Sequence, residues 1–260
     1  MNLKKVKKFI YKKMKFKTIS IVIPVYNEEN LVTKALQRVI KSDTCGLKKE
    51  IIIINDGSTD RTLTKIKDSF DIAQDKSAQD KQKLILINKK KNEGKGAALK
   101  IGFKKSTGDL VVVQDADLEY NPEDYPALIE PFIKYNADAV FGSRFISAQP
   151  HRILYFWHAF GNRFLTFLSN MLSNFNLTDV AAGYKVFRGD LIRKIAPKLK
   201  VKGFGFDPEI TARLAKIKNI KLYEVGISYQ GRTYEEGKKI NWIDGIKAII
   251  QTLYFNLKID

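Results

Sequence analysis

Two carboxylates one residue apart, Asp115 and Asp117, follow the apolar segment 110–113. That segment has the composition of a buried strand, and side chains two positions apart in an extended chain lie on the same side. Parallel α/β sheets bind ligands beyond the carboxyl ends of their strands, where such oxygens suit Mg²⁺ or Mn²⁺ and its phosphate ligands. Glu119 continues the alternation as a third candidate ligand. The alternative is an acidic turn without a metal.

Polar, turn-rich sequences, PVYNEE and NDGSTD, also follow the first two predicted strands. Tyr26 offers a ring on which a base can stack, and the Asp56 carboxylate can accept a hydrogen bond from a base N–H or a ribose hydroxyl. Both sequences could instead only cap helices, since Asp, Ser and Thr accept hydrogen bonds from the first amides of a helix. We favour capping for Thr59 and Asp60, and a ligand contact for Asp56.

A third sequence, NEGKGAA over residues 92–98, sets Lys95 between two glycines at the start of a predicted helix. Glycines permit close backbone approach, and the amides of a helix start favour an anion, so we expect Lys95 to bind the nucleotide. The sequence is no Walker loop, because the earlier glycine and the Ser or Thr after the lysine are missing. It is no dinucleotide fingerprint either, because Leu99 stands where the third glycine belongs.

The elements that must position these residues alternate along the chain. We expect strands at 18–25, 50–54, 83–88, 109–113, 138–142 and near 220–228, and helices at 28–41, after 60, at 94–106, 123–135, near 189–196, at 207–216 and at 241–256. Uniformly apolar strands alternating with helices indicate a mostly parallel sheet covered on both faces, in one α/β domain with a C-terminal helical part. The repetitive polar segment 71–82 is expected to be an exposed loop insertion.

The composition excludes several kinds of site and restricts where the protein is expected to act. The single cysteine, Cys45, excludes an internal disulfide and a multi-thiolate metal site, and the two histidines, His151 and His158, do not have the spacing of a zinc site. No secretory signal and no uninterrupted apolar run of about 18–20 residues is present, so we expect a cytoplasmic protein. The net charge of +18 fits nucleic acid, anionic lipid, a phosphorylated substrate, or merely a lysine-rich composition.

Taken in order, these motifs resemble the family 2 glycosyltransferases with a GT-A type fold. The later sequences GSRF, TDVAAGYKVFR, GFGFDPEI and GRTYEEGKKINWIDGIKA make the chain similar to the branch that contains dolichyl-phosphate mannose and polyprenyl-phosphate sugar synthases, over about residues 18 to 250. The departures are few. Asn55 replaces a frequent Asp, Glu119 stands where several relatives have Gln, and the transmembrane tail of some relatives is absent.

The resemblance implies a role for each motif. The residues expected to hold the nucleotide are Pro24, Tyr26, Glu28, Asp56 and Asp115, in addition to Lys95. The metal, Mg²⁺ or Mn²⁺, would be held with its diphosphate by Asp115, Asp117 and Glu119. The acceptor phosphate would meet Arg144, while Arg232, Lys238 or Lys239 would close over the phosphates. The expected catalytic residues are Asp117, Arg144 and Glu209.

The predicted reaction is an inverting transfer of a hexose-type sugar from a UDP or GDP donor to a polyprenyl phosphate, of undecaprenyl or dolichyl type. A phosphate monoester is largely ionised near neutral pH, so it needs no general base. A sugar hydroxyl, the alternative acceptor in polysaccharide or glycolipid synthesis, would need one, and Asp207 or Glu209 could supply it. Both could also only favour a helix N-terminus. The sugar, and the choice between UDP and GDP, stay open.

Membrane association is expected at two places. Residues 1–17 carry eight lysines among apolar side chains and could lie on an anionic membrane or form a basic tail. The aromatic run from Tyr155 to Phe167 suits a membrane interface or plain core packing. We therefore expect a basic segment 1–17, a catalytic domain 18–230, and an acceptor-side loop with an amphipathic helix over 231–260, on a protein peripheral to the cytoplasmic membrane. The need for a separate membrane subunit stays open.

Two other classes compete. A nucleic-acid-binding module would use the positive charge, but the lysines are diffuse and no recognised nucleic-acid motif is present, so we expect no nucleic acid partner. A sugar nucleotidyltransferase would carry a glycine-rich basic loop right after its first strand. Here that position is acidic, from Pro24 to Glu29, which ranks this class last.

Overall fold

Apolar, β-branched segments form one seven-stranded sheet at the centre of the computed structural model, which describes residues 15–76, 83–147, 152–153, 155–203, 205–233, 235 and 242–258. The strands are β1 (Thr18–Val25), β2 (Lys48–Asn55), β3 (Lys83–Asn88), β4 (Leu110–Val113), β5 (Ala139–Ser143), β6 (Lys185–Arg188) and β7 (Leu222–Gly226). Their order in the sheet is β3-β2-β1-β4-β6-β5-β7. All neighbours pair in parallel except β6, which is antiparallel to β4 and to β5.

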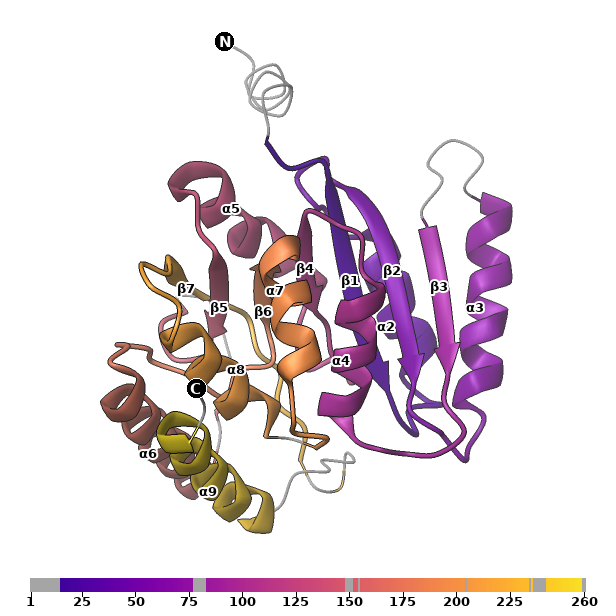
Figure 1. Cartoon of the computed structure of the whole chain (residues 1–260). Helices are drawn as coiled ribbons and strands as arrows, with labels where there is room; N and C mark the ends of the chain where they lie inside the picture. Colours follow the sequence, from indigo (N-terminus) through magenta and orange to yellow (C-terminus); the bar gives the residue numbers. More distant parts are fainter. Residues whose placement is uncertain are drawn as a thin grey trace.

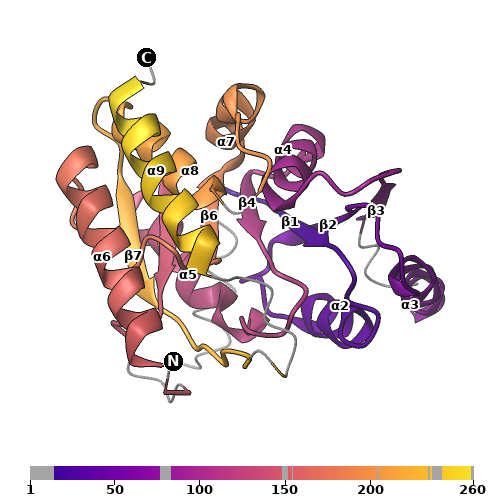
Figure 2. The same ribbon diagram turned by 90° about the horizontal axis from the view of Figure 1, so that it is seen from below.

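Helices cover both faces of this sheet (Figures 1 and 2). They are α2 (Val32–Lys41), α3 (Thr62–Lys76), α4 (Lys95–Lys105), α5 (Tyr125–Tyr135), α6 (Phe156–Ser173), α7 (Gly189–Ile195), α8 (Phe206–Ala215) and α9 (Trp242–Lys258), with short 3₁₀ turns at Pro122–Asp124 and Ala196–Lys198. Helices α2, α3 and α5 pack on one face, and α4, α7 and α8 on the other. Helix α9 lies beside α6 and packs on α8 (Figure 2).

Alternating side chains of the strands supply two cores. In β1, Ile19, Ile21 and Ile23 enter the core beneath α2 and α5, whereas Val22 enters the core beneath α4. Period-two alternation in a strand covered on both faces requires apolar residues at nearly every position, and β1 and β2 have them. The resulting mixed α/β sheet, with helices on both faces, confirms the fold class expected from the sequence.

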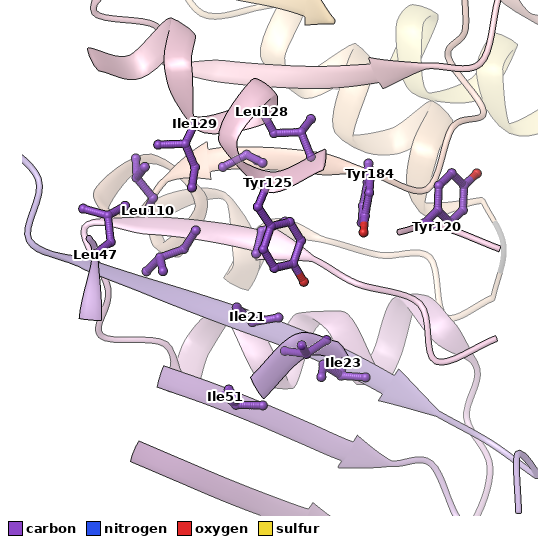
Figure 3. Packing of buried hydrophobic residues seen from close by; sticks show 14 of the residues in the cluster. Ile21, Ile23, Leu47, Ile51, Leu110, Tyr120, Tyr125, Leu128, Ile129 and Tyr184 are labelled. Atoms are coloured by element: carbon purple, nitrogen blue, oxygen red, sulfur yellow. The ribbon is translucent and has the colours of Figure 1, made fainter. Parts of the chain in front are cut away.

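The core beneath α5 also fixes the strand end that carries the acidic motif (Figure 3). The hydroxyls of Tyr125 and Tyr184 donate to the side-chain oxygen of Gln114, at 2.6 and 2.8 Å, and both rings are fully buried. The amide nitrogen of Gln114 in turn donates to the carbonyl of Asp115, at 2.9 Å. Burial raises the pKa of both tyrosines well above the usual value, so they act as neutral donors.

The expected boundaries agree with the structure to within a few residues, with three differences. Helix α6 was not among the expected helices, because its sequence was interpreted only as an aromatic run. The segment 71–82 is not wholly a loop, because α3 continues to Lys76; its first half contains good helix formers, and residues 77–82 lie outside the described part. Strand β6 was not predicted. It is four residues long, too short for its alternation to stand out. Among the described helices, none is both long and apolar enough to cross a membrane.

Candidate active site

The acidic motif lies at the carboxyl end of β4, at the edge of the sheet where β1, β2 and β3 also end. Between Asp117 and Glu119, Leu118 adopts a left-handed backbone conformation with φ of 64°. That conformation is uncommon for a branched residue and is found where surrounding structure enforces it, often at functional sites. The turn is held by a hydrogen bond from the Glu119 amide to the Asp117 carboxylate, at 3.1 Å.

Lys95, at the start of α4, forms an ion pair with Asp115 in which the closest nitrogen–oxygen distance is 2.6 Å. The helix start itself does not present its amides to an anion as expected. The amides of Gly96 and Ala97 donate to the carbonyls of Gly203 and Lys202. A β-carbon at Gly96 would lie 2.5 Å from the Val201 carbonyl oxygen. The glycines therefore admit a neighbouring backbone, and Lys95 is the group that faces the site.

Arg232 lies among the remaining acids. Its guanidinium nitrogens are 3.3 Å from Asp117, 3.4 Å from Glu119 and 3.6 Å from Glu28. The backbone holds it there, because the Arg232 amide donates to the Glu119 carboxylate and the Gln230 amide donates to the Glu119 carbonyl. The structure thus brings together acids from two loops of the sheet and an arginine more than a hundred positions away.

Burial, followed by the charges of Asp115 and Glu119, raises the pKa of Asp117 to about 7, against the opposing charge of Arg232. Burial lowers the pKa of Lys95, but the charges of Asp115, Asp207 and Asp117 outweigh it and hold the pKa above the usual value. Lys95 is therefore a permanent cation beside a carboxylate that titrates near neutrality. Such a cluster at a strand end can bind a phosphorylated ligand together with a cation.

The loops after β1 and β2 are joined to each other. The Asn27 amide donates to Ser58 and the Glu28 amide to Thr62, at 3.0 and 2.8 Å, which holds the segment of Tyr26 at this edge. Asp56 is buried, and its carboxylate accepts hydrogen bonds from Lys89, Glu93 and Gly94. Its predicted contact with the nucleoside competes with these bonds. Pro24, Tyr26 and Glu28 are partly accessible, and their roles stay predictions.

Arg144 forms a buried bidentate ion pair with Asp179, with nitrogen–oxygen distances of 2.7 and 2.8 Å. Its guanidinium carbon is 5.1 Å from the centre of the Tyr229 ring, and the Tyr229 hydroxyl donates to Glu119. Arg144 therefore reaches the acidic cluster through Tyr229, as a residue that positions others. Its expected contact with an acceptor phosphate stays a prediction, and Arg144 as a whole is only 8% exposed.

The two acids at the start of α8 differ in surroundings. Glu209 is fully buried and accepts hydrogen bonds from Arg213 and from the amides of Lys200 and Val201. These bonds compete with its predicted catalytic role, which stays a prediction. The Asp207 side chain is 20% exposed and lies 2.5 Å from the ammonium of Lys185, which is itself fully buried. The sequence could not separate the two, because both satisfy the same helix start.

The oxygen donors fit a divalent cation such as Mg²⁺ or Mn²⁺ in chemical type. Burial and then the neighbouring carboxylates raise the pKa of Asp117, and a cation would relieve the repulsion between these carboxylates. Within the described ranges, no three His, Cys, Asp or Glu side chains gather closely enough to hold a metal ion. Glu119 faces Tyr229 and Arg232 instead. The fit therefore concerns Asp115 and Asp117, with the place of Glu119 as a ligand still a prediction.

Three residues that contact the candidate site residues, Lys185, Asp179 and Tyr229, were not predicted individually. Lys185 and Asp179 lie within the sequence TDVAAGYKVFR, and a lysine between apolar strand residues was the available signal. Nothing in the sequence pointed to Tyr229 except that it lies three positions before Arg232. Lys238, Lys239 and His151 lie outside the described residues. His158 packs its ring edge-on against Tyr155, at 5.6 Å between ring centres.

Beside the site, helices α6 and α9 expose a large apolar surface. Of the 15 large hydrophobic side chains that are exposed in the described part of the chain, 11 lie on these two helices. This α6–α9 apolar surface consists of Phe156, Trp157, Phe160, Phe164, Phe167, Met171, Ile246, Ile250, Leu253, Tyr254 and Leu257. It borders the site because Arg152, just before α6, donates to the carbonyl of Gly231, next to Arg232.

Comparison with known proteins places this geometry in context. A protein similar over 93% of this chain and 97% of its own length, at 26% identity, is the UDP-N-acetylglucosamine–dolichyl-phosphate N-acetylglucosaminyltransferase of Methanococcus voltae. The dolichol-phosphate mannosyltransferase of Pyrococcus furiosus is 31% identical over 85% of this chain, which spans 60% of that protein. A structure of glucosyl-3-phosphoglycerate synthase from Mycobacterium tuberculosis, with Mn²⁺, UDP and phosphoglyceric acid, shares the fold with a TM-score of 0.68, at 17% identity, over 98% of this chain and 82% of that one.

The model of one protein family, glycosyl transferase family 2, matches residues 20–196, which include most of β1, all of β2 to β6 and the acidic motif. This match covers most of the chain and all the strand ends that form the candidate site. The chain therefore belongs to glycosyl transferase family 2 and is a glycosyltransferase.

Proposed function

We propose that this glycosyltransferase moves a sugar from a nucleotide diphosphate to a polyprenyl phosphate at a membrane surface. The observation that carries the proposal is the α6–α9 apolar surface, which borders an acidic and basic cluster through the bond from Arg152 to Gly231. A lipid phosphate needs both features, an apolar surface for its chain and cations near its head group. Relatives whose names include dolichyl, dolichol and undecaprenyl phosphate support the same acceptor class.

In the proposed reaction, an oxygen of the acceptor phosphate attacks the anomeric carbon of the donor sugar. The bond from that carbon to the β-phosphate oxygen breaks, and its electron pair leaves with the nucleoside diphosphate. Arg232 and Lys95 supply positive charge beside the departing diphosphate. The acceptor is already ionised near neutral pH, with a second pKa of about 6, so no residue has to remove a proton from it.

A divalent cation held by Asp115 and Asp117 would neutralise charge on the leaving diphosphate. Pro24, Tyr26 and Glu28, at the end of β1, are the proposed contacts to the nucleoside. The cation itself, the donor nucleotide and the position on the cytoplasmic face of the membrane are parts of this proposal.

A sugar hydroxyl is the second candidate acceptor, and one observation favours it. The partly exposed Asp207 carboxylate lies close enough to Lys95 for its charge to help raise the pKa of that lysine, and we infer that it could take a proton from a hydroxyl. Its ion pair with Lys185 competes with that role. The lipid phosphate therefore remains the preferred acceptor.

The test is transfer of label from UDP- and GDP-sugars into an organic-extractable product, with polyprenyl phosphate and with Mn²⁺ or EDTA. We expect label in the lipid fraction only when polyprenyl phosphate and Mn²⁺ are both present. Asp117→Asn should lower the rate on the order of 100-fold, because charge at the leaving group is lost. Asp138→Asn is the matched control, since Asp138 lies at the other end of the sheet and pairs with Arg188. If label appears in a water-soluble sugar and none in lipid, the proposed acceptor is wrong and a sugar hydroxyl is the acceptor.

A further inference from the structure

Arg232 is shared by acids from separate segments. Its guanidinium bridges Glu28, from the loop after β1, with Asp117 and Glu119, from the loop after β4. The side chain is only 14% exposed, and the acids around it are between 10% and 22% exposed. In this partly buried cluster the arginine does what a bound cation does, since it neutralises carboxylates that would otherwise repel one another.

The contacts are long for such a setting. All are at or above 3.3 Å, whereas charged hydrogen bonds usually measure about 2.7–2.9 Å. Two neighbouring pairs in the same protein reach the short range, Lys95 with Asp115 at 2.6 Å and Arg144 with Asp179 at 2.7 Å. Arg232 is therefore spread over several acids and fixed to none of them, an arrangement that a stronger partner can displace.

We propose that Arg232 is a resident counter-cation that competes with the divalent metal for the acidic cluster and transfers to the donor diphosphate when the metal binds. This inference rests on the proposed metal site at Asp115 and Asp117. A divalent ion carries twice the charge and would repel the guanidinium from Asp117. The diphosphate, which arrives with the metal, offers the planar arginine the paired oxygens that its fork prefers.

Two couplings of opposite sign follow. While Arg232 occupies the cluster it weakens the binding of free metal, because the metal must displace a cation. Once the diphosphate is present the same arginine strengthens nucleotide binding. Such coupling energies usually change an affinity about 5- to 150-fold. If Arg232 only supported the fold, its removal would weaken the binding of both the metal and the nucleotide.

The experiment measures Mn²⁺ affinity without nucleotide, by titration calorimetry or electron paramagnetic resonance, and UDP affinity at saturating Mn²⁺. Arg232→Met should bind free Mn²⁺ about tenfold more tightly and UDP about tenfold more weakly than the unchanged protein. Arg232→Lys keeps the charge without the fork, so it should keep the weak Mn²⁺ affinity and still lose UDP affinity. Arg61→Met is the matched control, because Arg61 is 82% exposed and pairs with Glu29 on the same rim; both affinities should stay unchanged.

The proposal is overturned if Arg232→Met binds free Mn²⁺ no more tightly than the unchanged protein, including the case in which neither binds it. Lower affinity for both ligands in Arg232→Met, with the Lys variant unaffected, would also overturn it. Neither affinity measurement depends on transfer to a lipid, so the two proposals can fail separately. If the Arg232→Met affinities for Mn²⁺ and UDP shift in opposite directions but only a soluble sugar is labelled, this inference holds and the proposed acceptor is wrong. If lipid is labelled but the two affinities do not shift in this way, the acceptor holds and this inference is wrong.

Discussion

Buried charges around the site are paired, and the pairing decides what each residue can do. Glu209 and Asp207 stand two positions apart in the sequence, yet one is enclosed by Arg213 and backbone amides and the other lies at the edge of the cluster. Arg144 is likewise held by Asp179. At this scale a residue type shows only which chemistry is available, and the partner shows whether that chemistry is free to act on a ligand.

The pair of Lys185 and Asp207 yields a prediction on stability. Lys185→Met keeps the length of the side chain but leaves Asp207 and the carbonyls of Val180 and Ala182 without their buried donor. Removing one partner of a buried pair costs about 3–5 kcal/mol, and partial exposure of Asp207 favours the lower end. Urea unfolding measures the loss. Asp207→Asn in the same chain should restore part of it, because no unpaired charge remains. A double variant as unstable as the sum of the single changes would contradict the pairing.

The two ends of the central strands differ in what they contribute. The carboxyl ends lead into the loops of the candidate site, and the amino ends carry contacts that stabilise the fold. The loops after β1, β2 and β4 meet at the site. At the other end of β2, Glu50 accepts hydrogen bonds from Ser20 of β1, Lys83 of β3 and Thr107 before β4. The Glu50 carboxylate therefore links β1, β2, β3 and the loop before β4, and Glu50 is only 4% exposed.

Glu50 therefore predicts a pH dependence. Burial opposes its ionisation, but the hydrogen bonds from Lys83, Ser20 and Thr107 outweigh burial and hold the pKa below the usual value. A carboxyl with a lowered pKa stabilises the fold above its unfolded pKa, and that contribution is lost as the pH falls through the folded value. Glu50→Gln should lower the free energy of unfolding by about 2 kcal/mol at pH 7.

Urea unfolding from neutral to acid pH checks this. The difference between Glu50→Gln and the unchanged protein should shrink as the pH falls. Glu130→Gln is the control, since Glu130 is 52% exposed and pairs only with Lys134 one turn away on α5, an interaction of about 0.2–0.5 kcal/mol. A Glu50 difference that stays constant with pH would show that its charge does not contribute.

The whole molecule carries a cluster of charged side chains at one edge of the sheet and two helices that expose apolar side chains. Helices α6 and α9 pack side by side, although they are separated by most of the C-terminal third of the chain (Figures 1 and 2). The exposed fractions there reach 74% for Trp157 and 71% for Leu257. Contiguous exposed apolar side chains usually mark an interaction site, and the positive net charge fits the anionic membrane that we propose as the partner.

Membrane binding by this surface is testable with phospholipid vesicles that contain or lack an anionic lipid. Trp157→Ser and Leu257→Ser should each lower the affinity in co-sedimentation about tenfold or more, because each loses about 1.5–3 kcal/mol of apolar burial. Tyr135→Ser is the matched control, since Tyr135 is 55% exposed on α5, outside the surface. Equal losses in the control and the α6 variant, or unchanged binding in both helix variants, would remove the membrane from the proposal.

The sequence by itself determined most of the elements, although not α6 or β6, and the chemistry that was available. Uniformly apolar runs predicted β1 to β5, the acidic motif predicted a ligand site at a strand end, and the order of the motifs predicted the family. These features are local, since periodicity and turn residues act over a few positions. The same local signals did not predict β6, which is short and pairs antiparallel between strands distant in sequence.

Only the tertiary structure decided which candidates are engaged by other groups. It enclosed Glu209, paired Arg144 with Asp179, turned the amides at the start of α4 towards Gly203 and Lys202, and set Arg232 among the acids. Each outcome depends on partners far along the chain, and burial makes their charges interact strongly. Residue types and spacing therefore determine what a site can bind, while burial and long-range pairing determine which side chains are left to bind it.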